Sequence, residues 1–281
     1  MGCSPRPWCV LHSVGRVACG AWGRAVIGGR PLLIHGHPGH ELRLFRWMEE
    51  HKPILFLMTD GSGRCGARTD YSRACAQRAG ATASGIFGLA SDRCWYDAIL
   101  SGDLSLFRTV VDAVVEIGAA QTSPLLVSDA VDGYNPMHDL CEATVAAAVA
   151  KLRLMGLPAT HLVARAVPGS GGRCVVDAPV EGGHLRRKLA AIAAYAPLAE
   201  EVARVLGEEP EALHRERLFQ PSFEWPDVWT PEWERIGAER VAASKYARPI
   251  EYVRHVRPIA RALLCSPARA ATQAEHATCE S

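Results

Sequence analysis

The sequence predicts an α/β fold, a Rossmann-like three-layer sandwich with a mostly parallel central sheet. Two observations favour this class. Short, almost wholly apolar segments are typical of strands buried on both faces, and amphipathic helical segments alternate with them along the chain. With 281 residues and 48% hydrophobic content, the chain is long enough to build one substantial core.

The first strand–helix–strand unit is the clearest element of this pattern. Residues 31–35 and 54–58 are apolar runs, and residues 40–51 between them carry apolar side chains at helical spacing. Two strands joined by a helix run parallel. Later segments predict helices over 71–80, 104–118 and 185–206, an alanine-rich helix from Pro136 to near Gly156, a helix over 254–264, and strands over 85–89, 125–127 and 161–167.

One folded domain is expected over residues 25–265. Residues 1–24 are predicted to be an N-terminal extension open to disorder, and residues 266–281 a polar C-terminal tail. The stretch 210–231 is rich in proline and tryptophan and has no clear assignment. Its tryptophans and the nearby Trp233 are interpreted as packing a long loop onto the core, with stacking on a ring of a ligand as the alternative.

Composition excludes several classes of partner. Charged residues make up 22% of the chain with a net charge of +1, which argues against a nucleic-acid partner. No apolar run reaches the ~18 residues that a membrane span needs. The N-terminus lacks the apolar run of a signal peptide, and the ten cysteines show no C-x-x-C spacing. We therefore expect a cytoplasmic protein with mostly reduced thiols; a homo-oligomer stays open.

Ligands of parallel sheets bind beyond the carboxyl ends of the strands, which points to the loops 36–41, 60–68 and 129–138. The first carries His37 and His40, three residues apart where a strand gives way to a helix. The third ends in His138. Three protein ligands are usual for a catalytic zinc site. On pattern alone, a metal site and a set of surface or helix-capping histidines both stay open.

The loops resemble those of the PIG-L/LmbE family of N-deacetylases. Residues 33–41 look like the A-H-P-D-D-E signature, and residues 135–138 look like H-P-D-H. Residues 57–61 resemble the L-T-x-G strand end, and residues 188–195 are similar to K-x-x-A-x-x-x-Y. The resemblance implies a zinc enzyme that acts on amino sugars.

The resemblance also implies roles for single residues. The zinc ligands fall on His37, His40 and His138, with His40 in place of an aspartate. A neutral imidazole there leaves the full charge on the metal, and such sites lower the pKa of bound water to about 7. The general base falls on Gly39, which has no side chain, and the histidine that stabilises the oxyanion falls on Asn135.

Other residues are expected to complete the site. Asn135 can donate its amide N–H to an oxyanion. Asp132 is favoured as the replacement for the missing base, because it shares the loop of Asn135 and is free of strand packing. Asp129, Asp60 and Glu41 are the other candidates for this role. Arg68, Asp92 and Tyr134 are expected to contact the substrate.

The sequence thus predicts a zinc-dependent hydrolase that removes an N-acyl group, N-acetyl above all, from an amino-sugar-containing small molecule. Three alternatives stay open: a family member that binds metal without catalysis, favoured by Gly39; a metallohydrolase of another bond, such as a formamide or ester; and a metal-free nucleotide-sugar transferase or binding protein.

Overall fold

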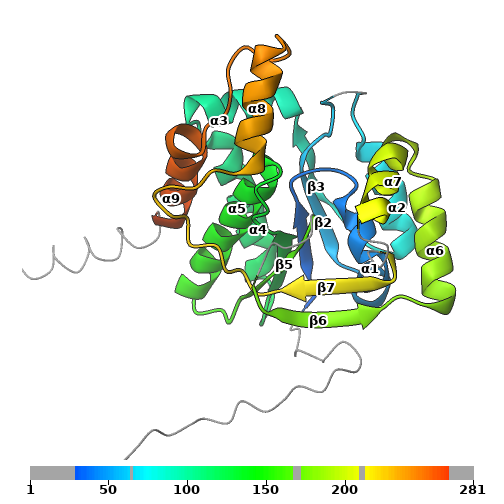
Figure 1. The fold of residues 1–281 in the computed structure, drawn as a ribbon. Coiled ribbons are helices and arrows are strands. Elements are labelled where there is room, and N and C mark those ends of the chain that lie inside the picture. Colours follow the sequence, from blue (N-terminus) through cyan, green and yellow to red (C-terminus); the bar gives the residue numbers. More distant parts are fainter. Residues whose placement is uncertain (1–28, 64–65, 167–171, 209–212, 266–281) are drawn as a thin grey trace, which may run out of the picture.

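The computed structural model describes residues 29–63, 66–166, 172–208 and 213–265. Within them the chain forms a seven-stranded sheet with helices on both sides, a Rossmann-like three-layer α/β sandwich (Figure 1). The predicted fold class is confirmed. The predicted N-terminal extension and C-terminal tail lie outside the described residues.

The sheet has the strand order β3-β2-β1-β4-β5-β7-β6. Its first five strands pair in parallel, and β7 runs antiparallel to both of its neighbours. The strands are β1 (Leu32–His35), β2 (Ile54–Thr59), β3 (Thr82–Ala90), β4 (Leu125–Asp129), β5 (Thr160–Ala164), β6 (Cys174–Pro179) and β7 (Arg215–Phe219).

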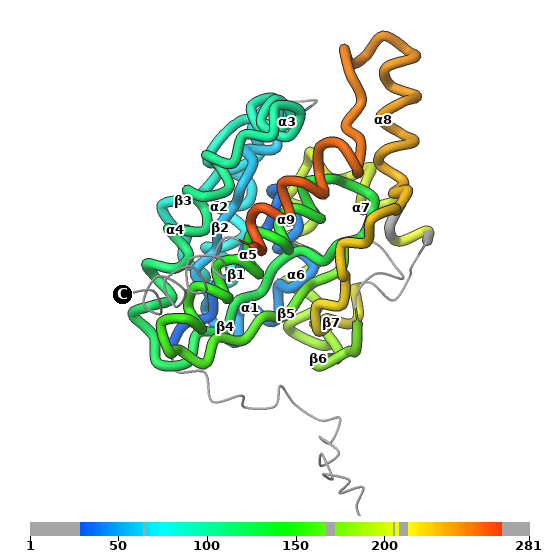
Figure 2. The backbone as a smooth tube through the Cα atoms, turned by 90° about the vertical axis from the view of Figure 1, so that its left-hand side faces the viewer, coloured from blue at the N-terminus to red at the C-terminus, as the bar shows by residue number. Residues whose placement is uncertain are grey.

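The helices form two layers, which Figure 1 shows on either side of the sheet. One layer contains η1 (His40–Leu44), α1 (Phe45–His51), α2 (Thr69–Ala79), α6 (Gly182–Ala193), η2 (Ala196–Leu198) and α7 (Ala199–Glu208). The other contains α3 (Asp92–Ser101), α4 (Ser105–Ala119), α5 (Pro136–Leu154), α8 (Glu232–Ala242), the π-helical turn η4 (Tyr252–Val256) and α9 (Arg257–Cys265). Figure 2 shows α9 lying alongside α5.

The alternation of side chains in the strands explains where polar groups are buried. In β1, Leu32 and Ile34 pack into the core under α4 and α5, whereas Leu33 packs into the core under α1 and α2. His35 and Asp129, at the carboxyl ends of β1 and β4, are buried as well. Buried polar side chains therefore gather at the carboxyl edge of the sheet.

Several predicted elements need correction. The helix predicted over residues 185–206 is two helices, α6 and α7, separated by η2. Pro197 lies at this break; it has no backbone N–H to continue a helical hydrogen-bond pattern. The unassigned stretch 210–231 contains the strand β7, and the sequence pattern missed α3, α8 and β6.

The tryptophans of the C-terminal part pack as interpreted from the sequence. Trp225 and Trp233 are buried in the core under α4 and α5, and Trp229 packs against it.

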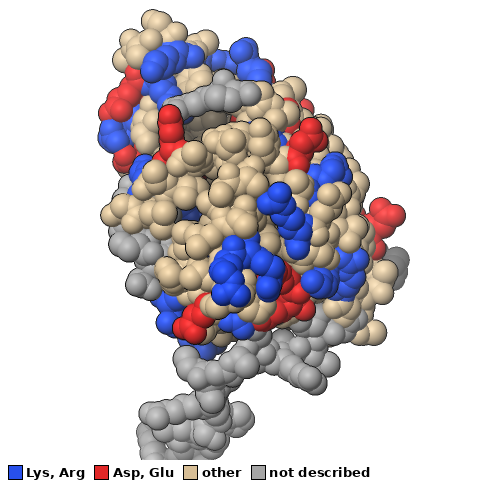
Figure 3. Space-filling model, turned by 90° about the vertical axis from the view of Figure 1, so that its right-hand side faces the viewer, with Lys and Arg blue, Asp and Glu red and all other residues tan. Residues whose placement is uncertain are grey.

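Figure 3 shows the face that carries α6 and α7, where Lys and Arg side chains are interspersed with Asp and Glu. No described helix combines the length and apolar character that a membrane crossing requires.

Candidate metal centre

The topology brings two of the predicted loops together. β1 pairs with β2 on one side and with β4 on the other, so the strand order reverses at the β1–β4 pair. The segment after β1 carries His37 and His40, and the segment after β4 leads to His138 in the first turn of α5. Such a switch point is where doubly wound sheets bind ligands.

Gly36 allows the two segments to approach closely. A Cβ at this position would lie 2.9 Å from the backbone oxygen of Met137 in the first turn of α5. The Gly36 N–H also donates to Asp129 Oδ2 over 2.7 Å. Any larger residue would therefore separate the loop of His37 from the helix of His138.

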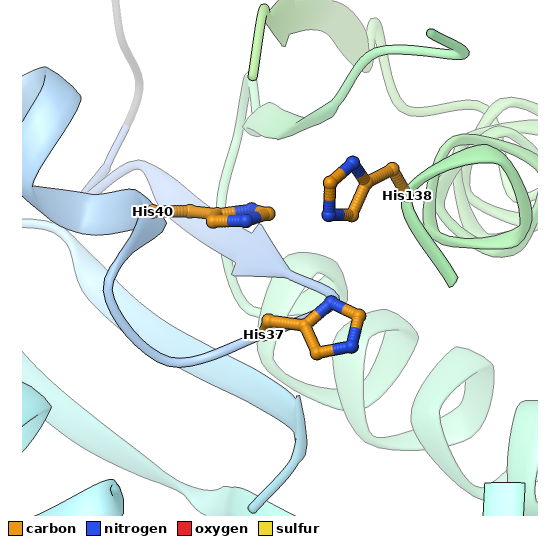
Figure 4. Close-up of side chains that lie close together, drawn as sticks. All are labelled: His37, His40 and His138. Atoms are coloured by element: carbon orange, nitrogen blue, oxygen red, sulfur yellow. The ribbon is translucent and has the colours of Figure 1, made fainter. Parts of the chain in front are cut away.

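The three imidazoles surround a common space, as Figure 4 shows. One nitrogen from each of His37, His40 and His138 lies within 4.8 Å of the others. The ring centroids of His40 and His138 are 4.5 Å apart, and that of His37 lies 5.3 Å from that of His138. The sequence prediction that these three residues converge is met, and the group can hold a metal ion.

Two of these imidazoles are hydrogen-bonded to carboxylates through Nδ1. Nδ1 of His40 lies 2.9 Å from Asp129 Oδ1, and Nδ1 of His138 lies 2.7 Å from Asp132 Oδ2. A ring that donates its Nδ1–H to a carboxylate keeps its Nε2 lone pair for a ligand, the usual arrangement of metal-binding histidines. Asp129 also binds Nδ1 of His35 over 2.7 Å.

His37 supplies the third nitrogen. Its Nδ1 is buried and has no hydrogen-bond partner. A buried polar atom without a partner costs free energy, so a ligand is its natural complement. The donor set is then Nδ1 of His37 and Nε2 of His40 and His138, which fits a divalent cation that accepts imidazole ligands, zinc among them.

A second group of possible ligands, His35, His40 and Asp129, shares one histidine with the first. Its distances fit hydrogen bonds. Two ligands of a tetrahedral ion with bonds of about 2.0–2.1 Å lie roughly 3.3 Å apart. The 2.7 Å between His35 Nδ1 and Asp129 Oδ1 is shorter than that. This group therefore serves to orient His40.

Burial and neighbouring charges set the protonation of the imidazoles. Burial lowers the pKa of His37 well below its ordinary value, and the nearby His138 and His40 lower it further. Burial would also lower the pKa of His138, but the hydrogen-bonded Asp132 outweighs it and raises this pKa to about 9. His138 would have to give up a proton to hold a cation through Nε2, because a ligating imidazole is neutral.

Position 39, where the resemblance places the general base, is closed to a side chain. Gly39 has φ 107°, a left-handed conformation that favours glycine. A Cβ there would collide with Cδ1 of Leu198, the buried last residue of η2. An apolar side chain thus occupies the space that an acid at residue 39 would need.

The two predicted catalytic residues lie beside the imidazoles. The side chain of Asp132 has no exposed surface, and both of its oxygens accept hydrogen bonds, one from His138 and one from the backbone N–H of Tyr134. Asn135 caps the N-terminus of α5, with Oδ1 accepting from Met137 N over 2.9 Å. Its amide N–H groups are left to donate.

The predicted substrate residues lie in the segments that follow β2, β3 and β4, and their environments differ. The half-buried Arg68 donates from Nε to Gly61 O over 3.1 Å, and its charge lowers the pKa of His37. Asp92 accepts from Gly63 N over 2.8 Å, while its Oδ1 is buried without a partner. Tyr134 is exposed, with the guanidinium of Arg204 5.5 Å from its ring centroid.

Sequence reasoning missed the role of His35 and the shared contact of Asp129 with two histidines. Strand alternation offers a signal for both. Leu33 pairs with Val127 in the parallel register, so His35 and Asp129, two residues further on, share one face of the sheet. This inference needs the knowledge that β1 and β4 are neighbours.

No protein-family model, no curated protein and no solved structure matches the chain.

Proposed function

We propose that the chain is a zinc-dependent hydrolase that removes an N-acyl group, N-acetyl above all, from an amino-sugar-containing small molecule. The set of three convergent imidazoles at the switch point of the sheet carries this proposal. Three protein ligands that leave a fourth position open are typical of catalytic zinc. The motifs that resemble those of PIG-L/LmbE deacetylases indicate the substrate class.

His37, His40 and His138 would hold the zinc ion, which when bound supplies Lewis-acid activation of an amide carbonyl and of water. Asp129 and Asp132 fix the rings of His40 and His138 through their Nδ1 atoms. Because both oxygens of Asp132 are engaged, we assign it this orienting role in place of the base that its loop position suggests.

Asn135 completes the proposed chemistry. Its side-chain oxygen is used by the helix cap, which fixes the amide plane and leaves the N–H groups to stabilise a developing oxyanion. One such donor is worth roughly 10²–10³ in rate. Arg68, Asp92 and Tyr134 are assigned to hold polar groups of the sugar.

A second candidate function is metal binding without hydrolysis. The contact of Leu198 with Gly39 favours it, because residue 39 cannot supply a base. General-base assistance is typically worth ~10²–10⁴ in rate.

One experiment separates the two. The zinc content of the purified full chain is compared with that of His37→Ala and of His184→Ala, a control histidine that pairs with Glu49 away from the site. Release of acetate or formate from N-acylated amino sugars is then measured. Zinc that depends on His37 together with acetate release supports the hydrolase. Zinc without cleavage supports the second candidate, and no zinc contradicts both.

A further inference from the structure

The loop that carries Asp132 is held by a segment from far along the chain. Trp233, in the first turn of α8, donates its backbone N–H to Gly133 O over 2.9 Å. Its indole Nε1–H donates to Asp139 Oδ2 over 2.7 Å. Trp233 and Asp139 are 94 residues apart and both are buried.

Asp139 links Trp233 to the loop that carries Asp132. Its other oxygen, Oδ1, accepts from the backbone N–H of Asp132 over 2.9 Å and from that of Gly133 over 3.1 Å. The indole therefore occupies one carboxylate oxygen and leaves the other to hold the two loop amides. The ring of Trp229 and the side chain of Pro231 both lie against Gly133, and Gly133 is buried.

The loop in turn fixes His138. Asp132 Oδ2 accepts from His138 Nδ1 over 2.7 Å, and the Asp132 side chain has no exposed surface. A continuous series of hydrogen bonds thus runs from Trp233 through Asp139 and Asp132 to a candidate metal ligand.

We propose that Trp233 is a positioning residue for His138, an inference that rests on the metal site of the proposed function. Without the indole N–H, Asp139 Oδ2 is left buried without a donor, which is unfavourable for a buried carboxylate. The carboxylate can recover a donor only by rotating away from the amides of Asp132 and Gly133. Asp132 then no longer fixes the ring of His138, and the cation loses a preorganised ligand.

If Trp233 had only a structural role, replacing it would lower stability without changing zinc binding. Trp233 belongs to the core under α4 and α5, so its truncation lowers stability in either case. Trp225 provides a matched control, because it lies in the same C-terminal segment, is 6% exposed against 5% for Trp233, and packs on Phe223 and Tyr252. Only Trp233→Phe removes the hydrogen bond to Asp139.

The test uses the full chain and measures Zn²⁺ affinity by competition with a chelator. The visible spectrum of the Co²⁺-loaded protein reports the ligand geometry. We expect Trp233→Phe to weaken zinc binding ~10-fold, at the lower end of the range for outer-shell partners, and to alter the cobalt spectrum. Trp225→Phe is expected to lower the melting temperature while both readouts stay as in the wild type.

Wild-type zinc affinity and an unchanged cobalt spectrum in Trp233→Phe would overturn the inference while leaving the metal site intact. If Trp233→Phe does not fold, Asp139→Asn serves as the test variant. Its amide NH₂ would face another donor, either the indole N–H or the two loop amides, so one of these hydrogen bonds is lost. The same loss of affinity is expected there, and wild-type affinity would again overturn the inference. A wild-type chain that binds no zinc would overturn the metal site and this inference together.

Discussion

Two buried clusters of ionisable side chains differ in how completely their polar atoms are paired. One is the ion pair of Lys188 with Glu216, between α6 and β7. The other is the histidine cluster at the carboxyl edge. Burial is common to both, so burial alone does not distinguish a structural cluster from a ligand site.

In the first cluster every polar atom has a partner. Lys188 Nζ donates to Glu216 Oε1 over 2.9 Å and to the backbone oxygen of Arg43 over 3.2 Å. The two oxygens of Glu216 accept the N–H groups of Arg46 and Trp47 in the first turn of α1. Such a carboxylate satisfies the helix N-terminus and its dipole. The cluster is complete without a ligand.

The histidine cluster is not complete in this sense. His37 Nδ1 and His35 Nε2 are buried without partners, although Asp129 and Asp132 engage the other rings. Carboxylates orient the imidazoles, and a nitrogen is left over where the rings converge. The difference identifies the unpaired nitrogen of His37, which lies where the three rings converge, as a candidate ligand position.

The largest expected effect tests the structural cluster. Lys188→Met leaves Glu216 buried without its cation and is expected to lower the free energy of unfolding by about 3–5 kcal/mol. Urea denaturation measures this. The neighbouring Arg187→Met removes an exposed cation while Glu49 keeps its contact with His184, and it should cost less than about 1 kcal/mol. Equal effects of the two variants would remove the contrast on which the comparison depends.

The next effect tests the ligand site by adding and removing metal. Zinc at 100 times its dissociation constant is expected to stabilise the wild type by about 2.7 kcal/mol, and a chelator should reverse this. His37→Ala should lose the stabilisation, yet differ little from the wild type in chelator, because His37 Nδ1 has no hydrogen bond to lose. Thermal unfolding with and without zinc measures both. A zinc-induced shift that persists in His37→Ala would contradict the assignment.

A smaller effect is expected from the carboxylate shared by two histidines. Asp129→Asn keeps the size of the side chain but places an NH₂ group against either the Gly36 N–H or the two imidazoles. Zinc affinity should fall ~10–100-fold, the usual cost of losing an outer-shell partner. Asp177→Asn, at an exposed ion pair with Arg215, is the control and should leave zinc affinity unchanged.

The smallest effect is a pH dependence of the Lys188 contribution. Burial lowers the pKa of Lys188, and Glu216 opposes this shift without cancelling it. Between the lowered folded-state pKa and the unfolded-state value near 10.4, the unfolded chain binds more protons, so stability rises with pH there. The difference in free energy of unfolding between wild type and Lys188→Met should therefore grow with pH in this window, by at most about 1.4 kcal/mol per pH unit. A difference that shrinks as the pH rises would contradict it.

The parallel half of the sheet could be predicted from sequence because its strands are apolar runs with one physical interpretation. β6 and β7 could not, because β7 begins with three charged residues, Arg215 to Arg217, and only its last two residues are apolar. The break between α6 and α7 shows the opposite error. The helical spacing of apolar residues continues across Pro197, but the helix itself is interrupted there.

The three imidazoles could be predicted because each follows a strand or begins a helix at one edge of the sheet. Their supporting groups could not. The contact of Asp129 with His35 depends on which strand lies beside β1, and the contact of Trp233 with Asp139 joins residues 94 positions apart. No local pattern records such pairings, since they arise only when the segments pack.

The contact between Leu198 and Gly39 limits which substitutions residue 39 can accept. An aspartate at position 39 meets both the left-handed backbone and the buried Leu198 methyl group. Either the Leu198 side chain would have to shift, or a shorter residue at position 198 would have to make room and would open a cavity beside the metal loop. The first step toward an acidic residue 39 is therefore expected to lower stability, because the left-handed backbone at this position strains any side chain.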